Sequence, residues 1–220
     1  MRLVLTSDTH TKVNPAIIPD GDVFIHCGDL CESGTPEDWK NQIEWLSELK
    51  HKTKLMIFGN HDFHPHLYPG PALQDMRKIG FTVVGMPGND RWSTYTLENG
   101  KVILGLPYVV SMPRWAFNIS KGELSVHLLK FKDIDIVCSH SPIYGILDEI
   151  KYPKEHVGIK AYKNFLEAVR PELWFSGHIH ESYGHYEYHH EKVDKITNLY
   201  NVCMQDYFGE QTNPPVVVDI

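Results

Sequence analysis

Phe58-Gly59-Asn60-His61-Asp62 is the stretch around which the chain is organised. It follows the apolar run Lys54-Leu55-Met56-Ile57, so it predicts a buried strand that ends abruptly in a polar loop. Gly and Asn are common in turns, and the stretch by itself is compatible with an ordinary turn. Its meaning depends on what the rest of the chain places beside it.

Four other short apolar runs also end in polar clusters, which are Asp8-Thr9-His10, Gly28-Asp29, Ser139-His140 and Gly177-His178-Ile179-His180. Ligands of open α/β sheets bind where strands end in loops on one side, so residues distant in sequence are expected to meet in one crevice. Carboxylate, imidazole and amide groups without matched cysteines suit Mn²⁺, Fe²⁺, Zn²⁺ or Mg²⁺. They argue against an all-cysteine structural zinc.

Length and charge narrow the function classes. The 220 residues, 42% of them hydrophobic, can bury a substantial core, and we expect a single domain over residues 1–220. Lys and Arg total 21 against 28 acids, a net charge of −7. This balance argues against a sequence-independent grip on duplex nucleic acid, although a local basic patch stays compatible with it.

We expect no signal for export or membrane insertion in this chain. Its N-terminus becomes polar after five residues, and no apolar run approaches the ~20 residues of a membrane span. We therefore expect a soluble, cytoplasmic protein without membrane contact. Its four cysteines are then expected to be reduced and buried; they are Cys27, Cys31, Cys138 and Cys203.

Periodicity and turn residues predict an α/β protein. Strands are expected over residues 2–7, 23–27, 54–57, 81–86, 134–138, 173–176, 197–203 and 215–219. Helices are expected over 72–79 and 159–169, with a loop over 64–71 between strand and helix. Asn99-Gly100 predicts a hairpin with a two-residue type I′ turn, which requires positive φ at both residues.

A third helix has clear start signals. Thr35-Pro36-Glu37-Asp38 combines an N-cap, a proline at the first helical position and an acid at the third. The helix is expected to run to about Lys50. Its apolar stripe is formed by Trp39, Ile43, Leu46 and Leu49, which should pack on the sheet.

The five polar clusters, in this order, resemble the signature of the calcineurin-like metallophosphoesterase family. Segments 18–30, 181–184 and 212–215 are similar to small stand-alone metallophosphoesterase-domain proteins related to class III cyclic-nucleotide phosphodiesterases. The resemblance implies the family's α/β/β/α four-layer sandwich, with two mixed sheets packed face to face and helices outside. Composition and periodicity alone predict only the α/β class.

Matched residue by residue, the resemblance implies two divalent metal ions. One would be bound by Asp8, His10, Asp29 and His180, and the other by Asn60, His140, His178 and the same Asp29. Manganese is the favoured metal, with iron, zinc, magnesium or cobalt as alternatives. The implied reaction is attack on a phosphoester by a hydroxide that bridges the ions.

The two residues after Asn60 are candidates for catalysis. His61 can face the leaving group instead of the metals and donate a proton near neutrality, so we assign it as general acid. Asp62 can orient a ligand or His61 as a second-layer carboxylate. It can equally hold the loop together, and the sequence does not separate these roles.

The function implied by the resemblance is binuclear hydrolysis of a phosphodiester, with a small phosphoester such as a cyclic nucleotide as substrate. A phosphomonoesterase, a nuclease and a non-catalytic metal-binding module are the alternatives. Substrate contacts are expected from loops 89–92, 113–118 and 144–157, where Trp92, Trp115 and Phe117 could stack on a base or simply pack. The aromatic segment 112–118 is compatible with a buried loop or a cleft rim.

Overall fold

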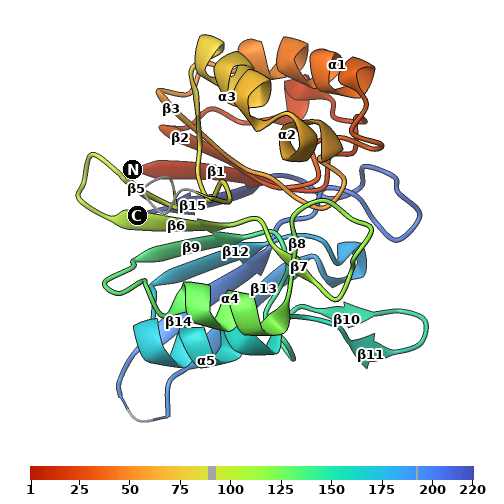
Figure 1. Cartoon of the computed structure of the whole chain (residues 1–220). Helices are drawn as coiled ribbons and strands as arrows, with labels where there is room; N and C mark the ends of the chain where they lie inside the picture. The colour runs from red at the N-terminus through yellow and green to blue at the C-terminus, as the bar shows by residue number, and fades with distance from the viewer. Residues whose placement is uncertain (89–92, 192) are drawn as a thin grey trace.

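Two mixed β-sheets form the centre of the protein (Figure 1). The computed structural model describes residues 1–88, 93–191 and 193–220. In the first sheet four strands are parallel and the outer strand β15 is antiparallel to β1. The strand order is β15 (Val216–Asp219), β1 (Arg2–Thr6), β2 (Val23–Cys27), β3 (Thr53–Ile57) and β4 (Phe81–Val83).

The second sheet has four parallel strands between two antiparallel outer ones. Its order is β13 (Gly184–His189), β14 (Ile196–Asn201), β12 (Leu173–Ser176), β9 (Ile136–Ser139), β6 (Val102–Leu106) and β5 (Thr94–Thr96). Two short pairs lie outside this sheet. They are β7 (Val109–Val110) with β8 (Asn118–Ile119), and β10 (Glu149–Ile150) with β11 (Glu155–His156).

Helices cover the outer face of each sheet (Figure 1). The first sheet carries α1 (Pro36–Ser47), α2 (Phe63–Leu67) and α3 (Pro69–Lys78), and the second carries α4 (Lys121–Leu128) and α5 (Lys160–Val169). Two 3-10 turns are η1 (Pro15–Ile17) and η3 (His180–Ser182). The predicted α/β/β/α sandwich is confirmed. No helix in the described part of the chain has the length and apolar character needed to cross a membrane.

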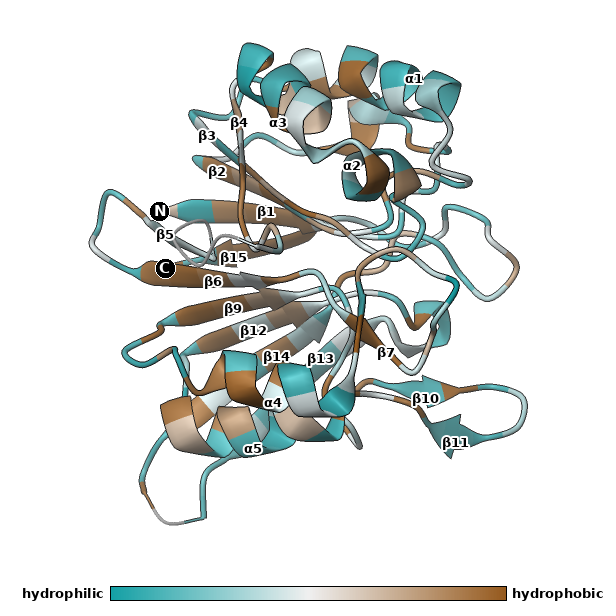
Figure 2. Cartoon of the chain, in the orientation of Figure 1, coloured by the Kyte–Doolittle hydropathy of each residue, from teal (hydrophilic) through white to brown (hydrophobic). Residues whose placement is uncertain are grey.

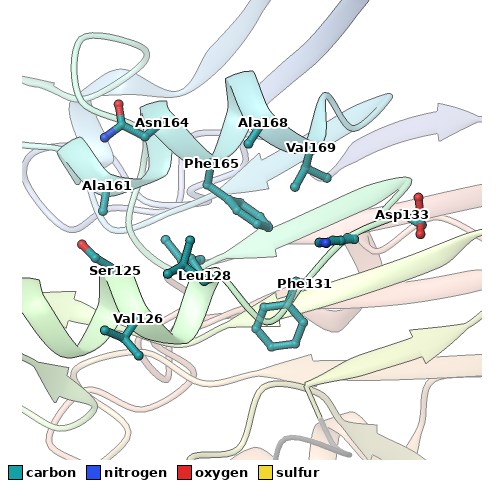
Figure 3. Close-up of a pocket in the computed structure, with 12 residues that line it drawn as sticks. Ser125, Val126, Leu128, Phe131, Asp133, Ala161, Asn164, Phe165, Ala168 and Val169 are labelled. Carbon is teal, nitrogen blue, oxygen red and sulfur yellow. The ribbon is translucent and has the colours of Figure 1, made fainter.

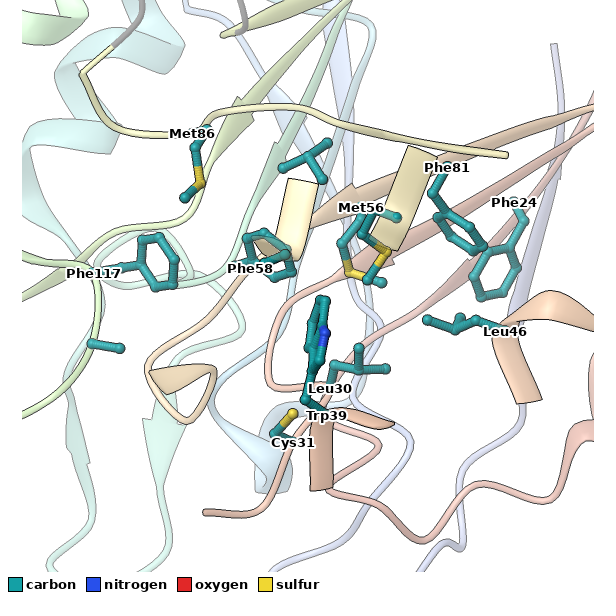
Figure 4. Close-up of a cluster of buried hydrophobic side chains, with 14 of the residues drawn as sticks. Phe24, Leu30, Cys31, Trp39, Leu46, Met56, Phe58, Phe81, Met86 and Phe117 are labelled. Carbon is teal, nitrogen blue, oxygen red and sulfur yellow. The ribbon is translucent and has the colours of Figure 1, made fainter. Parts of the chain in front are cut away.

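Alternating side chains build three apolar layers. In β1, Leu3 and Leu5 face the second sheet, whereas Val4 faces α1 and α3. This period of two follows from the pleat of a strand. Figure 2 shows the strands mostly apolar and the surface loops mostly polar, and Figure 4 shows the layer between the first sheet and its helices, where Phe24, Met56 and Trp39 pack.

The start of α1 matches its sequence signals. The Thr35 hydroxyl accepts the N–H of Asp38 at 3.1 Å, and the Asp38 carboxylate accepts the N–H of Thr35 at 3.4 Å and that of Ser33 at 3.0 Å. Trp39 and Leu46 are buried, as predicted from the apolar stripe. The helix ends at Ser47, three residues before the predicted end at Lys50.

The hairpin between β5 and β6 is present, but the predicted two-residue turn is wrong. Gly100 has a positive φ of 87°, whereas Asn99 is not among the positive-φ residues. The Gly100 N–H donates to the Leu97 carbonyl at 2.9 Å, and the Leu97 N–H donates to Lys101 at 2.9 Å. This is a three-residue loop, in which only the last position needs the left-handed conformation.

Other differences lie where tertiary packing decides the backbone. The predicted loop 64–71 is mostly helical, in α2 and the first turn of α3, with Pro65 buried. The elements α4, β7, β8, β10, β11 and β13 were not predicted from the sequence. The four cysteines are free and buried, as expected.

We predict that Thr35→Ala lowers the free energy of unfolding by about 1 kcal/mol, because it removes the acceptor for the Asp38 N–H. Urea titration followed by circular dichroism measures the change. Thr35→Ser keeps the hydroxyl and should be close to the parent protein. Equal stability of Thr35→Ala and Thr35→Ser would show that the cap does not stabilise α1.

Candidate metal centre

The predicted ligands meet at one edge of the sandwich, where the parallel strands of both sheets end. The first sheet delivers Asp8 and His10 after β1, Asp29 after β2 and Asn60 after β3; the second delivers His140 after β9, and His178 and His180 after β12. The two sheets are joined at this edge by a parallel bridge between Ser7 and Cys203, with the Met204 N–H on the Ser7 carbonyl at 2.9 Å. All seven predicted ligands are therefore brought together.

One group of possible metal ligands contains Asp8, His10 and His180, with one ligand atom of each within 4.8 Å of the others. His180 Nε2 lies 3.4 Å from Asp8 Oδ1, and His10 Nε2 lies 3.9 Å from the same oxygen. The other Asp8 oxygen accepts the His178 N–H at 2.9 Å. Asp8 thus ties the β12 loop to the first sheet while it faces two imidazoles.

A second group contains Asp29, His140 and His178. His140 Nε2 lies 3.4 Å from Asp29 Oδ2 and 2.9 Å from the side-chain oxygen of Asn60. The rings of His140 and His178 are in edge contact, with centroids 4.9 Å apart. Asn60 therefore lies with this second group, as its predicted role requires.

Asp29 lies between the two groups. Its Oδ2 atom is 3.8 Å from His10 Nε2 in the first group and 3.4 Å from His140 Nε2 in the second. Its Oδ1 atom accepts the backbone N–H of His61 at 2.8 Å. One carboxylate oxygen is thus held by the loop, and the other faces ligands of both groups.

Backbone carbonyls orient two of the imidazoles. His140 Nδ1 is 3.0 Å from the Cys27 carbonyl, and His180 Nδ1 is 3.2 Å from the Asp206 carbonyl. A carbonyl oxygen can only accept a hydrogen bond, so each Nδ1 carries the hydrogen and donates it. Each Nε2 is then directed toward a carboxylate, that of Asp29 for His140 and that of Asp8 for His180. Metal-binding histidines commonly use this arrangement.

His10 provides the test of whether a cation fits. Its side chain is buried, yet neither ring nitrogen has a hydrogen bond within the protein. The Glu32 carboxylate is the nearest acid to Nδ1, at 3.5 Å. A buried imidazole without partners is costly, and a divalent cation beside Nε2, Asp8 and Asp29 would satisfy it. The donor set of oxygen and imidazole nitrogen fits such ions.

The charges of the centre favour a cation. Burial alone would raise the pKa of Asp8 and Asp29, but the neighbouring histidines outweigh burial and hold both values below the usual range. Conversely, burial lowers the pKa of His140 and His180, but the two carboxylates outweigh it and raise both to about 9. Protons on these imidazoles occupy the positions that metal ions would take, so metal binding should release protons.

Four of the candidate ligands have a left-handed backbone conformation. Asp8, His10, Asp29 and His178 have φ of 53°, 40°, 53° and 69°, a left-handed region that residues with a Cβ rarely adopt. Such conformations persist when surrounding contacts require them, and they cluster at functional sites. Here they turn the side chains from the strand ends into one space.

Close packing explains two glycines of the motifs. A Cβ on Gly59 would lie 2.5 Å from the Asp29 nitrogen and 2.6 Å from His140 Cε1. A Cβ on Gly177 would overlap the Ser7 hydroxyl and the Asp8 carboxylate. These positions admit glycine alone because another loop of the centre lies directly against the backbone.

His61 and Asp62 lie beside the ligands but differ in surroundings. The centroid of the His61 ring lies 4.6 Å from that of the His10 ring and 4.5 Å from that of the Trp115 ring. The Nδ1 atom of His61 donates a hydrogen bond to the Glu32 carbonyl at 2.5 Å. Asp62 is buried, and its two oxygens accept the N–H groups of Cys31 at 2.9 Å and Gly59 at 2.8 Å. These two hydrogen bonds agree with the role in which Asp62 holds the loop together. Burial and the charge of Asp29 raise the Asp62 pKa to about 7.

A cavity of about 390 Å³ opens on the ligands, and Met112, Trp115, Tyr207 and Phe208 contribute to its wall. Trp115 is 37% exposed at the rim, whereas Phe117 is only 2% exposed and stacks on Phe58 in the core. Segment 112–118 is therefore partly a cleft rim, at Trp115, and partly a buried loop, at Phe117. Phe117 is a packing residue. The candidate loop 89–92, with Trp92, lies outside the described residues.

Of two further cavities, one adjoins the candidate metal centre and the other lies away from it. One of about 730 Å³ adjoins the centre at His178 and Met112 and is lined by Tyr144, His156 and Val157 of the predicted loop 144–157. Another, of about 610 Å³, lies between α4 and α5 (Figure 3) and has no candidate ligand among its described lining residues.

Sequence reasoning missed several contributors to the site. Glu32 and Asp206 contact His61 and His180 through their backbone carbonyls, which no side-chain pattern reveals. Tyr207 and Phe208 follow β14, whose parallel pairing with β12 brings its end to the same edge. An aromatic pair in the loop that follows the strand predicted over 197–203 was the available signal.

Comparison with known proteins agrees with this geometry. The model of the family described as calcineurin-like phosphoesterase matches residues 1–182. Metallophosphoesterase domain-containing protein 1 of Homo sapiens and that of Mus musculus are each 31% identical over 238 residues, covering 100% of this chain and 71% of theirs. A UPF0046 protein of Caenorhabditis elegans is 28% identical, covering 84% of this chain and 65% of its own.

We predict that Gly59→Ala weakens divalent-metal binding and destabilises the fold by roughly 1–3 kcal/mol, because the new methyl group must displace Asp29 or His140. Calorimetric titration with Mn²⁺ and thermal melts measure the two effects. Gly122→Ala is the matched control, since a Cβ there meets nothing within 4 Å. Unchanged Mn²⁺ affinity in Gly59→Ala would contradict the packing argument.

Proposed function

Because the chain belongs to the calcineurin-like phosphoesterase family, we propose that it hydrolyses a phosphodiester with two divalent metal ions, a cyclic nucleotide being one candidate substrate. The single observation that carries this proposal is the position of Asp29 Oδ2, which faces His10 at 3.8 Å and His140 at 3.4 Å. A carboxylate oxygen between two ligand groups is suited to be shared by two ions.

The proposed ligands follow from the two groups. Asp29 would be shared; Asp8, His10 and His180 would complete the first site, and Asn60, His140 and His178 the second. We propose Mn²⁺ as the metal because oxygen and imidazole donors, including an amide, suit it, with Fe, Zn, Mg or Co able to use the same donors. When bound, two such ions supply a water-derived nucleophile at neutral pH and stabilise charge on the phosphoryl oxygens.

His61 is proposed to protonate the leaving oxygen. Its Nδ1 is fixed on the Glu32 carbonyl at 2.5 Å, which leaves Nε2 as the atom able to deliver a proton. The ring also lines the cavity that contains the ligands. Asp62 is proposed to act indirectly, by holding the loop of Gly59 against that of Cys31.

A diester is favoured over a monoester by the charge of the cavity. Lys12 is the one lysine or arginine among its described lining residues, and its Nζ is engaged by the Gly209 carbonyl at 2.8 Å. Glu32 contributes a negative charge to the same wall. A diester carries one negative charge and a monoester close to two near neutrality, so the diester needs fewer cationic side chains.

We predict that Asp29→Ala loses both metal ions, whereas His178→Gly loses one, because Asp29 is the shared ligand. Metal content after dialysis against metal-free buffer, measured by mass spectrometry, distinguishes them. Turnover should fall more in Asp29→Ala than in Asp8→Ala or His140→Ala. A melt of each variant checks folding, since bound ions can stabilise the fold. An Asp29→Ala protein that keeps two ions and its activity would refute the shared site.

We predict that His61→Ala keeps its metal ions but loses turnover by about 10²–10⁴-fold on an alkyl ester, the usual effect of removing a general acid. The loss should be much smaller for a nitrophenyl leaving group, which departs without a proton. Both substrates are compared on the same metal-loaded preparation. Equal losses on the two esters would remove the general-acid assignment.

A further inference from the structure

The loop after β14 displays aromatic side chains that the core does not use. Tyr207 is 49% exposed and Phe208 is 76% exposed. Tyr152, between β10 and β11, is 72% exposed, and its ring lies 6.4 Å from that of Tyr207. Exposed apolar groups that gather in this way mark interaction sites more often than isolated ones do.

A lysine lies at the centre of these rings. The Nζ atom of Lys151 is 5.7 Å from the Tyr152 ring, 5.5 Å from Tyr207 and 5.7 Å from Phe208. We call these four residues the aromatic cluster. All three distances lie within the range of about 6 Å from a ring centroid in which cation–π attraction operates.

The loop is held in a defined position. The Asp206 carboxylate accepts the N–H of Phe208 at 2.8 Å and that of Glu210 at 3.1 Å, and the Asp206 N–H donates to the Glu210 carbonyl at 2.9 Å. In Figure 1 this loop, which connects β14 to β15, projects at the right of the view. Phe208 is therefore displayed by a closed turn.

The same loop is bonded directly to the metal centre. The Asp206 carbonyl accepts from His180 Nδ1 at 3.2 Å, and the Gly209 carbonyl accepts from Lys12 at 2.8 Å. Tyr207 and Phe208 line the cavity that also contains His10 and His180. A phosphoester bound at the candidate ligands would thus have its substituent beside Tyr207 and Phe208, the two members of the aromatic cluster that line this cavity.

We propose that the aromatic cluster binds the base of a nucleoside phosphodiester, an inference that rests on the proposed function. A planar base offers its π-face to Phe208 or Tyr207, as in sequence-tolerant stacking of nucleic acid bases on aromatic side chains. Lys151 contributes a cation beside these rings. The residue that selects the substrate would then be Phe208, with Tyr207 beside it.

Two esters with one leaving group test the proposal. They are thymidine 5′-(4-nitrophenyl phosphate) and methyl 4-nitrophenyl phosphate, assayed on Mn²⁺-loaded protein by nitrophenol release. The parent protein should show a KM about fivefold to 150-fold lower for the nucleoside ester, the range of one stacked base. Phe208→Ala, and more fully the double variant Tyr207→Ala with Phe208→Ala, should raise the KM of the nucleoside ester toward that of the methyl ester, so that the ratio of the two KM values approaches one.

Control variants separate stacking from exposure. Phe208→Tyr keeps a ring and should retain the preference. Leu129→Ala removes an apolar side chain of similar exposure, 78%, outside the cavity that contains the ligands, and should change neither KM. Equal KM values for the two esters in the parent protein, or a preference that survives in the double variant, would overturn the proposal while leaving hydrolysis established.

A binding measurement decides the question without turnover. Calorimetry compares thymidine 5′-monophosphate with methyl phosphate on the same Mn²⁺-loaded protein. Tighter binding of the nucleotide, lost in the double variant, supports the aromatic cluster even if neither ester is hydrolysed, an outcome that would count against the proposed function alone. Equal binding of the two phosphates would overturn the aromatic cluster as a base site.

Discussion

Burial of two carboxylates, Asp8 and Asp29, is the constraint on which the rest of the structure depends. Both lie almost fully out of solvent where the two sheets meet. A buried carboxylate is tolerated only with charge partners and hydrogen bonds. The backbone N–H groups of His178 and His61 supply the hydrogen bonds, and His140 and His180 face them with imidazoles. Stable burial of the two carboxylates therefore requires loops from both sheets to meet at one edge. Each carboxylate is bonded there to a backbone N–H and faces an imidazole.

This requirement also accounts for the unusual backbone of the loops. A strand that simply continued would direct its next side chains alternately to the two faces of the sheet. Left-handed turns at Asp8, Asp29 and His178 instead direct them into the shared space, and Gly59 lets a neighbouring loop come close enough to complete it. The strain is local, and the apolar layers on both sides of each sheet hold the strand ends in place.

Much of the fold and the centre could be predicted because its residues interrupt strong local patterns. Apolar runs such as 23–27 and 173–176 match β2 and β12, and the ligands follow directly after them. The four-layer arrangement came from resemblance, since alternation along a strand does not say which sheet it joins. The helix over Phe63–Leu67 and the Asp206 carbonyl on His180 depend on tertiary contacts. Such contacts leave no periodic signal in the chain.

The division of the ligands between the sheets has a consequence for folding kinetics. Asp8, His10, Asp29 and Asn60 belong to the first sheet, and the three histidines at 140, 178 and 180 to the second. Each of the two proposed ligand groups takes side chains from both sheets, so neither would be complete until the sheets have docked. Interactions absent from the transition state slow unfolding without accelerating folding. Bound metal would then lower the unfolding rate and lengthen the lifetime of the native state, with little effect on the folding rate.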